Sequence, residues 1–199
     1  MDNPGIQLAN LYEKREYHKV VSMAENHPEI MAGEITTSEQ MDRSAMVSIS
    51  YFHERKPKEA LPILLQVVKY LEKTGEWMNQ TDLYPMLVAM TSESYFALRK
   101  SVAGLIFLRK RLPGIDDEET ISRLMPLLRF FADRLVRRVN TLLLVVLAVY
   151  ILVQKIFDVF SLQAYIPILS ALILGSLILV LWPSFFASML VRGSSSMRK

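Results

Sequence analysis

The chain has no cysteine among its 199 residues, only three histidines, and seven glycines that stand apart. The lack of cysteine excludes disulfides, thiolate metal sites and cysteine nucleophiles, and it is compatible with a reducing compartment. His18, His27 and His53 are scattered and have no acidic residue at metal-ligand spacing, and there is no glycine-rich phosphate loop. We therefore expect no enzyme activity, no cofactor and no metal site.

Strict alternation of apolar and polar residues, which is typical of half-buried strands, is also missing. Apolar residues recur instead at spacings of three and four through the N-terminal two thirds of the chain. The sequence therefore predicts an all-α fold. Helix pairs are expected over residues 6–24, 38–74 and 79–112, with breaks at Pro28, Gly75 and Pro113.

Long apolar runs are confined to the C-terminal end. Two of them, at about 139–160 and 165–191, can cross the ~30 Å hydrocarbon core of a bilayer at about 1.5 Å per helical residue. Basic residues stand on the outer sides of this pair, and the positive-inside tendency then places both ends of the chain in the cytoplasm. The flanking arginines are Arg134, Arg137, Arg138 and Arg192.

Small and polar residues within the predicted transmembrane hairpin suggest how it packs. Ala171 and Gly175, four residues apart, would let the second span pack closely on the first or on another copy, which allows a homo-oligomer. Gln154, Lys155 and Asp158 stand at the end of the first apolar run. They mark either the membrane interface or an ion path, and their place at the end of the run favours the interface.

A predicted helix over 116–138 links the N-terminal domain to the first span. It opens with acidic residues from Asp116 to Glu119, as the dipole of a helix start favours. We expect it to run close to the first span or to be continuous with it, with Pro126 as a site of kinking. The chain then divides into a helical domain at 1–115, this juxtamembrane helix, the transmembrane hairpin at 139–191 and a basic tail at 192–199.

The formal net charge of +3 comes from the membrane segment. Residues 1–140 hold 19 basic and 19 acidic residues, so the domain before the spans is neutral. A nucleic-acid-binding domain would carry a basic stripe on its surface. We therefore expect a protein and membrane lipid as partners, and no nucleic acid.

The succession of helix pairs resembles tetratricopeptide (TPR) repeats. In each pair a small residue on the first helix is followed three positions later by a tyrosine. These tyrosines, Tyr12, Tyr51 and Tyr95, are 39 and 44 residues apart, against about 34 in the family. The resemblance implies a stack of helical hairpins whose first helices present a concave face to a peptide or a partner's helix.

Four residues match the positions that face the groove of such a stack: Asn10, Met46, Met86 and Met90. They lack the basic side chains of the TPR domains that clamp a C-terminal carboxylate. We expect instead an apolar, methionine-rich groove that adapts to a helix or peptide. The alternative is that these methionines fill the core.

The leading hypothesis is a membrane-anchored TPR-like adaptor or scaffold that binds a protein partner at the cytoplasmic face of a bacterial inner membrane. A second hypothesis is a membrane effector or channel-like protein, in which the transmembrane hairpin oligomerises and the helical domain senses. A third is a mitochondrial-fission-like TPR adaptor, although that family has one span and this chain is expected to have two.

Overall fold

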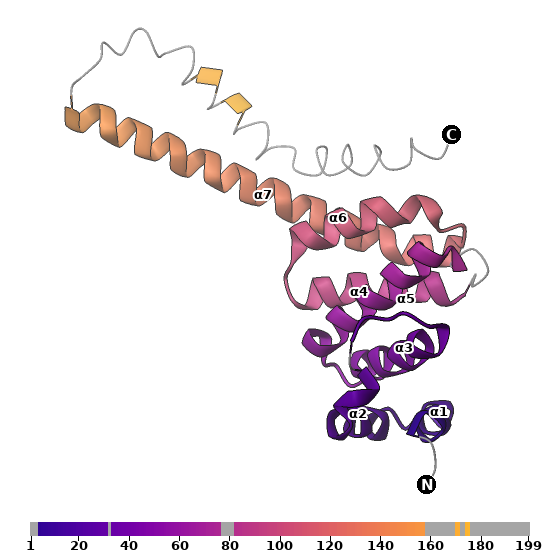
Figure 1. Cartoon of the computed structure of the whole chain (residues 1–199). Coiled ribbons are helices and arrows are strands. Elements are labelled where there is room, and N and C mark those ends of the chain that lie inside the picture. Colours follow the sequence, from indigo (N-terminus) through magenta and orange to yellow (C-terminus); the bar gives the residue numbers. More distant parts are fainter. Residues whose placement is uncertain (1–3, 32, 77–81, 158–169, 172–173, 176–199) are drawn as a thin grey trace. The chain divides into compact units, whose positions relative to one another are not determined.

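The computed structural model describes residues 4–31, 33–76, 82–157, 170–171 and 174–175. Every regular element among these residues is a helix, which confirms the predicted all-α fold (Figure 1). The chain divides into two compact units, Met1–Leu127 and Leu128–Lys199. The boundary between them falls inside the last long helix.

Three helical hairpins make up most of the first unit, and each forms where the apolar spacing predicts it. They are α1 (Pro4–Glu13) with α2 (Tyr17–Asn26), α3 (Ser38–His53) with α4 (Pro57–Thr74), and α5 (Leu83–Ala97) with α6 (Ser101–Arg111). Short 3-10 turns, η1 (Pro28–Met31) and η3 (Leu112–Gly114), occupy two of the breaks, and α7 (Glu118–Phe157) follows.

The three hairpins turn in the same way. In each turn an arginine adopts a left-handed backbone conformation, with φ of 57° at Arg15, 57° at Arg55 and 56° at Arg99. The amide that follows each arginine donates a hydrogen bond to the carbonyl five residues back, which satisfies a carbonyl at the helix end. These bonds run from Glu16 to Leu11, from Lys56 to Tyr51 and from Lys100 to Tyr95, at 2.9–3.0 Å.

The equivalent turns correct the repeat register expected from the sequence. Because the turn arginines are 40 and 44 residues apart, Tyr51 and Tyr95 correspond to Leu11 and not to Tyr12. The first interval is therefore 40 residues rather than 39.

Glycine at a turn position is expected to stabilise its hairpin. A left-handed backbone conformation costs a residue with a Cβ about 1–2 kcal/mol, and glycine avoids this cost. Because glycine has more conformational freedom to lose on folding, the gain in stability is reduced by ~0.5–1 kcal/mol. Arg15→Gly should therefore slow hydrogen exchange of the α1 and α2 amides by about two- to fivefold. Arg15→Val should speed it, because a β-branched residue fits this region poorly. Equal exchange in all three proteins would contradict the assigned turn.

Small buried residues lie on the first helices of the second and third hairpins, as the sequence pattern leads one to expect. Ser48 and Ser92 are both 0 % exposed. Their hydroxyls donate to carbonyls of their own helices, Ser48 to Ala45 at 2.9 Å and Ser92 to Val88 at 2.7 Å, so neither leaves a polar atom unpaired.

A partly buried ion pair joins α4 to α6. Arg111 Nε lies 2.6 Å from Glu72 Oε1, and Arg111 Nη2 donates to Glu72 Oε2 at 3.1 Å. Tyr84 of α5 donates to the same carboxylate at 3.1 Å. Burial, together with the Glu72 charge, raises the pKa of Tyr84. The Arg111 guanidinium also lies 4.1 Å from the centroid of the Phe107 ring, so side chains of three helices meet at one carboxylate.

The acidic residues before α7 act as the helix start that the sequence predicts. The Asp117 carboxylate accepts hydrogen bonds from the amides of Thr120, at 2.9 Å, and Glu119, at 3.3 Å. Hydrogen bonding, mainly from Thr120, lowers the pKa of Asp117. From Glu118 the helix continues through Pro126 to Phe157 without a break. The predicted juxtamembrane helix and the described part of the predicted first span are thus one helix.

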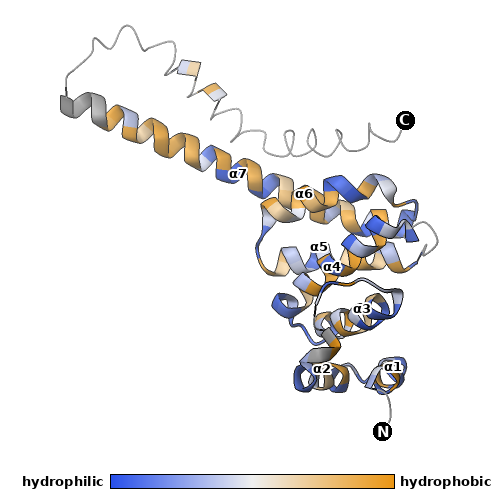
Figure 2. Cartoon of the chain, in the orientation of Figure 1, coloured by the Kyte–Doolittle hydropathy of each residue, from blue (hydrophilic) through white to orange (hydrophobic). Residues whose placement is uncertain are grey.

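The C-terminal part of α7 is apolar over most of its exposed surface (Figure 2). Val146 is 60 % exposed and Val149 is 53 % exposed. Among the described residues, one helix, over Glu118–Leu152 of α7, is long and apolar enough to cross a membrane. Just before the apolar run, Arg137 pairs with Asp133 at 2.9 Å, Arg134 is partly exposed and Arg138 is exposed.

Most of the second predicted span lies outside the described residues, as do Asp158, Arg192 and the tail at 192–199. Ala171 and Gly175 are described, and both are helical. Ala171 is exposed, and a Cβ built on Gly175 would meet no described atom within 4 Å. Close packing through this pair stays a prediction.

Candidate functional site

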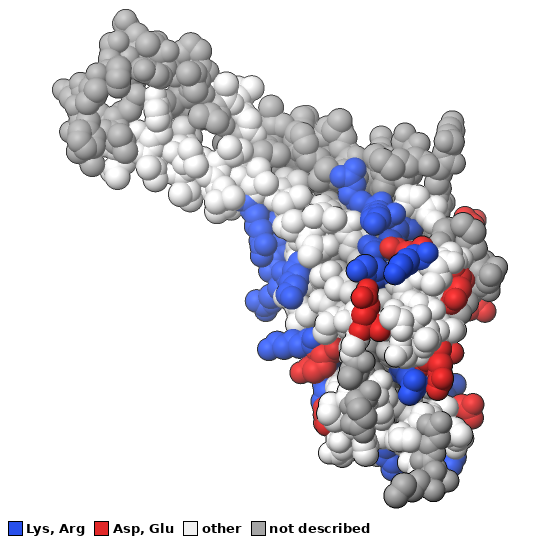
Figure 3. All heavy atoms as spheres, in the orientation of Figure 1, with Lys and Arg blue, Asp and Glu red and all other residues white. Residues whose placement is uncertain are grey.

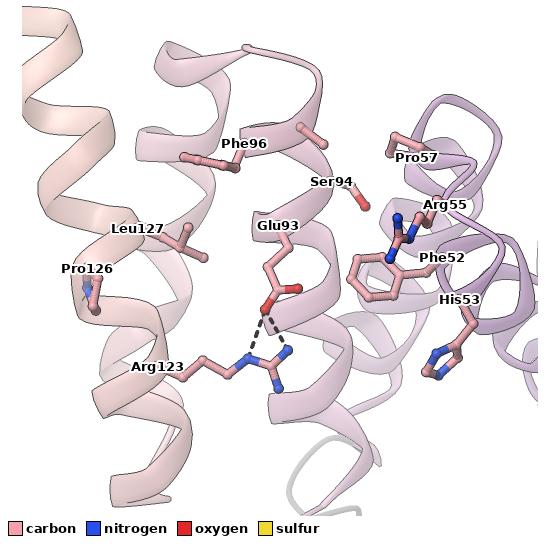
Figure 4. Close-up of a pocket in the computed structure, with 11 residues that line it drawn as sticks. Phe52, His53, Arg55, Pro57, Glu93, Ser94, Phe96, Arg123, Pro126 and Leu127 are labelled. Atoms are coloured by element: carbon pink, nitrogen blue, oxygen red, sulfur yellow. Dashed lines mark hydrogen bonds and ion pairs between the residues drawn. The ribbon is translucent and has the colours of Figure 1, made fainter.

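A pocket of about 710 Å³ opens on the first unit. Its lining comes from the C-terminal ends of α3 and α5, the start of α4 and the first turns of α7 (Figure 4). The site therefore lies on the first helices of the second and third hairpins and on the helix that follows them.

Apolar side chains form most of this lining. Phe52 and Phe96 occupy equivalent places, each three residues before a turn arginine. Phe96 is 43 % exposed, so part of its ring offers apolar surface at the pocket. Figure 4 shows Phe96 and Leu127 in the space between α5 and α7. Pro57, Ala97 and Pro126 complete the apolar surface.

Charged side chains stand at the rim. Arg123 Nε donates to Glu93 Oε1 at 2.8 Å, and Arg123 Nη2 lies 2.6 Å from the same oxygen (Figure 4). This pair joins α7 to α5, but its side chains are 59 % and 29 % exposed, so it contributes only about 0.2–1 kcal/mol. A bound ligand can therefore compete for either member.

The other two polar side chains of the rim, His53 and Arg55, differ in how they are held. The His53 ring stacks on the Tyr17 ring, with centroids 4.4 Å apart and planes 9° from parallel. Arg55 is exposed and forms no ion pair with any residue that the structure describes. The rim thus combines one acid that is already paired with one arginine that has no ion-pair partner among the described residues.

The four residues expected to line a groove lie elsewhere. Asn10 is exposed on α1, and Met46 and Met86 are half-buried on α3 and α5; none of the three lines the pocket. Met90 is 8 % exposed and lies among the core residues, where the alternative interpretation of these methionines places it. A binding role for Asn10, Met46 and Met86 stays a prediction.

Sequence reasoning missed the two pocket phenylalanines. The signal that points to them is a Tyr-Phe dipeptide that recurs at Tyr51–Phe52 and Tyr95–Phe96. Adjacent residues of a helix point about 100° apart, so the residue beside a core tyrosine turns away from the core. An aromatic residue in that place is a candidate for contact with another molecule.

No protein-family model, curated protein or solved structure matches this chain. The pocket and the apolar helix therefore carry the functional interpretation.

Proposed function

We propose that this protein is a membrane-anchored, TPR-like adaptor that binds a segment of a partner protein at the cytoplasmic face of a membrane. One observation carries the proposal. A single chain combines an apolar pocket that exposes aromatic side chains with a helix long and apolar enough to cross a bilayer.

The position of the pocket supports peptide binding. Stacks of helical hairpins present their first helices to a ligand as a continuous surface, and this pocket is lined by α3, α5 and α7. Its volume and its mainly apolar lining suit one or two large side chains of a docked segment.

The flanking charges support the orientation. Arg134, Arg137 and Arg138 directly precede the apolar run of α7, and such clusters stay on the cytoplasmic side. A second crossing over 165–191, followed by Arg192, would return the tail to the same side. The inner membrane of a bacterium is the setting that we propose.

One helix serves both the pocket and the anchor. α7 contributes Arg123, Pro126 and Leu127 to the lining, and its apolar run begins at Val139. A partner docked in the pocket would therefore contact the first turns of α7, the helix whose later part is the proposed span.

Photo-crosslinking of the full chain in native membranes tests the proposal. A benzophenone amino acid at Phe96 should capture a discrete partner protein, because this side chain is exposed within the pocket. The same probe at Lys69, which is exposed on α4 outside this pocket, is the positional control. Identical products at the two positions, or lipid adducts alone, would count against partner binding.

A matched pair of substitutions shows whether the captured protein occupies the pocket. Ala97→Trp places a large ring in the lining at an exposed position, so it should fill the pocket without disturbing the core. Ser22→Trp adds the same ring at an exposed site on α2. The Phe96 crosslink should disappear in the first variant and persist in the second.

A further inference from the structure

The charged residues at the rim of the pocket indicate which charge a bound partner segment carries. Glu93 is engaged by Arg123, whereas Arg55 has no ion-pair partner among the described residues. The neighbouring Lys56, in contrast, pairs with Glu25 at 2.9 Å. Arg55 therefore leaves a positive charge beside Phe52 at the edge of the apolar lining (Figure 4).

The backbone that carries Arg55 is held in place. The Arg55 amide donates to the Phe52 carbonyl at 3.0 Å, and the Lys56 amide donates to the Tyr51 carbonyl at 2.9 Å. These bonds fix the turn between α3 and α4 before any ligand arrives. Binding an anion here requires only the ordering of one side chain, which reduces the entropy lost on binding.

Arg123 offers a second, shared site for an anion. A guanidinium has five N–H donors, and Arg123 directs its Nε and Nη2 at a single oxygen of Glu93. With the Arg123 side chain 59 % exposed, its remaining donors can bind another carboxylate. An arginine from the turn between α3 and α4 and an arginine from α7 thus border one apolar surface.

We infer that the pocket binds a segment of a partner protein that carries a large apolar side chain next to one or more carboxylates. The apolar side chain packs between Phe52, Phe96 and Leu127, and the carboxylate pairs with Arg55. The inference rests on the proposed function, because it concerns the same pocket.

Other occupants fit this rim less well. A wholly apolar segment would cover Arg55 without giving it a partner, which is unfavourable for a charged group. A basic segment would bring like charges together. The same rim would accept phosphate oxygens, so a phosphorylated apolar segment is the related chemistry to be distinguished.

Peptide titration of the full chain in phosphatidylcholine nanodiscs tests the inference. The probes are short fluorescent peptides that share one Phe and one Leu and differ only in flanking residues, which are Glu, Gln, Lys or phosphoserine. The Glu peptide should bind about fivefold more tightly than the Gln peptide, the upper range for a solvent-exposed ion pair. The Lys peptide should bind most weakly, and added salt should reduce the differences.

The repeated turns supply the matched control. Arg15 and Arg55 occupy equivalent turns, but only Arg55 lines the pocket. Arg55→Gln should remove the preference for Glu over Gln, whereas Arg15→Gln should preserve it although the net charge changes equally. Equal losses in the two variants would overturn the inference, as would equal affinity of the Glu and Gln peptides in the unsubstituted protein.

The remaining outcomes separate this inference from the proposed function. If all peptides bind equally and Ala97→Trp abolishes binding, the pocket binds apolar segments and the acidic preference is wrong. If only the phosphoserine peptide binds more tightly than the Gln peptide, and Arg55→Gln removes this difference, the anion is phosphate and the carboxylate assignment is wrong. If no peptide binds and Phe96 also gives no protein crosslink, both proposals fail.

Discussion

Replacing Val146 by arginine is expected to keep α7 out of the membrane. Val146 lies near the middle of the apolar run that begins at Val139, and its side chain is 60 % exposed. A charged residue at the centre of a span costs about 2.5–3.5 kcal/mol on insertion scales, which is a factor of roughly 100. The substitution should therefore convert most chains to a form in which α7 does not cross.

The absence of cysteine makes this result directly measurable. A single Val149→Cys substitution introduces a unique thiol into α7, which a membrane-impermeant reagent labels only when the helix is in water. Labelling should be low in the Val149→Cys chain and high when Val146→Arg is added. Ser122→Arg, in the exposed first part of α7, is the control and should leave the thiol protected. A thiol that reacts freely in every protein would mean that α7 does not span the bilayer.

Loss of the Arg111 side chain should strongly destabilise the helices of the first unit. Arg111 and Glu72 side chains are only 13 % and 25 % exposed, and Arg111→Ala leaves the Glu72 carboxylate without its cation. Breaking a fully buried pair in this way costs about 3–5 kcal/mol, and the partial exposure here reduces our expectation to ~2–3 kcal/mol. Hydrogen exchange of the α4 and α6 amides should accelerate by roughly 30- to 100-fold.

Two substitutions separate the ion pair from general effects on α6. Lys110→Ala removes the neighbouring, exposed charge and should change exchange little. Arg111→Lys keeps the charge but not the two-point contact with Glu72, so it should give an intermediate rate. Arg111→Ala and Lys110→Ala with the same exchange rates would show that the ion pair contributes nothing to the stability of these helices.

Sequence patterns were sufficient to locate the helices, because helix formation depends on residues that are close together in the chain. Apolar residues at spacings of three and four placed α1 to α6, and acidic residues marked the start of α7. The same spacing could not tell a groove residue from a core residue. Met86 and Met90 are both apolar residues of α5, yet the first is half-buried and the second belongs to the core.

The repeat register shows a second limit of sequence reasoning. Tyr12, Tyr51 and Tyr95 are all tyrosines, but they do not occupy equivalent positions. The carbonyl that accepts the turn hydrogen bond belongs to Leu11 in the first hairpin and to Tyr51 and Tyr95 in the other two. Residue identity is a weak guide to register, because several apolar side chains can occupy one core position. Backbone hydrogen bonds decide it, since a turn of fixed geometry admits only one register.

The sequence by itself determined that this protein is helical and that α7 carries a segment apolar and long enough for a bilayer, because helix periodicity and run length are properties of neighbouring residues. Only the tertiary structure decided which distant side chains meet. Arg111 bonds Glu72 across 39 residues and Arg123 bonds Glu93 across 30. Such contacts depend on how helices pack in space, which spacing along the chain does not encode. The pocket, its two phenylalanines and an Arg55 without an ion-pair partner among the described residues arise at that level.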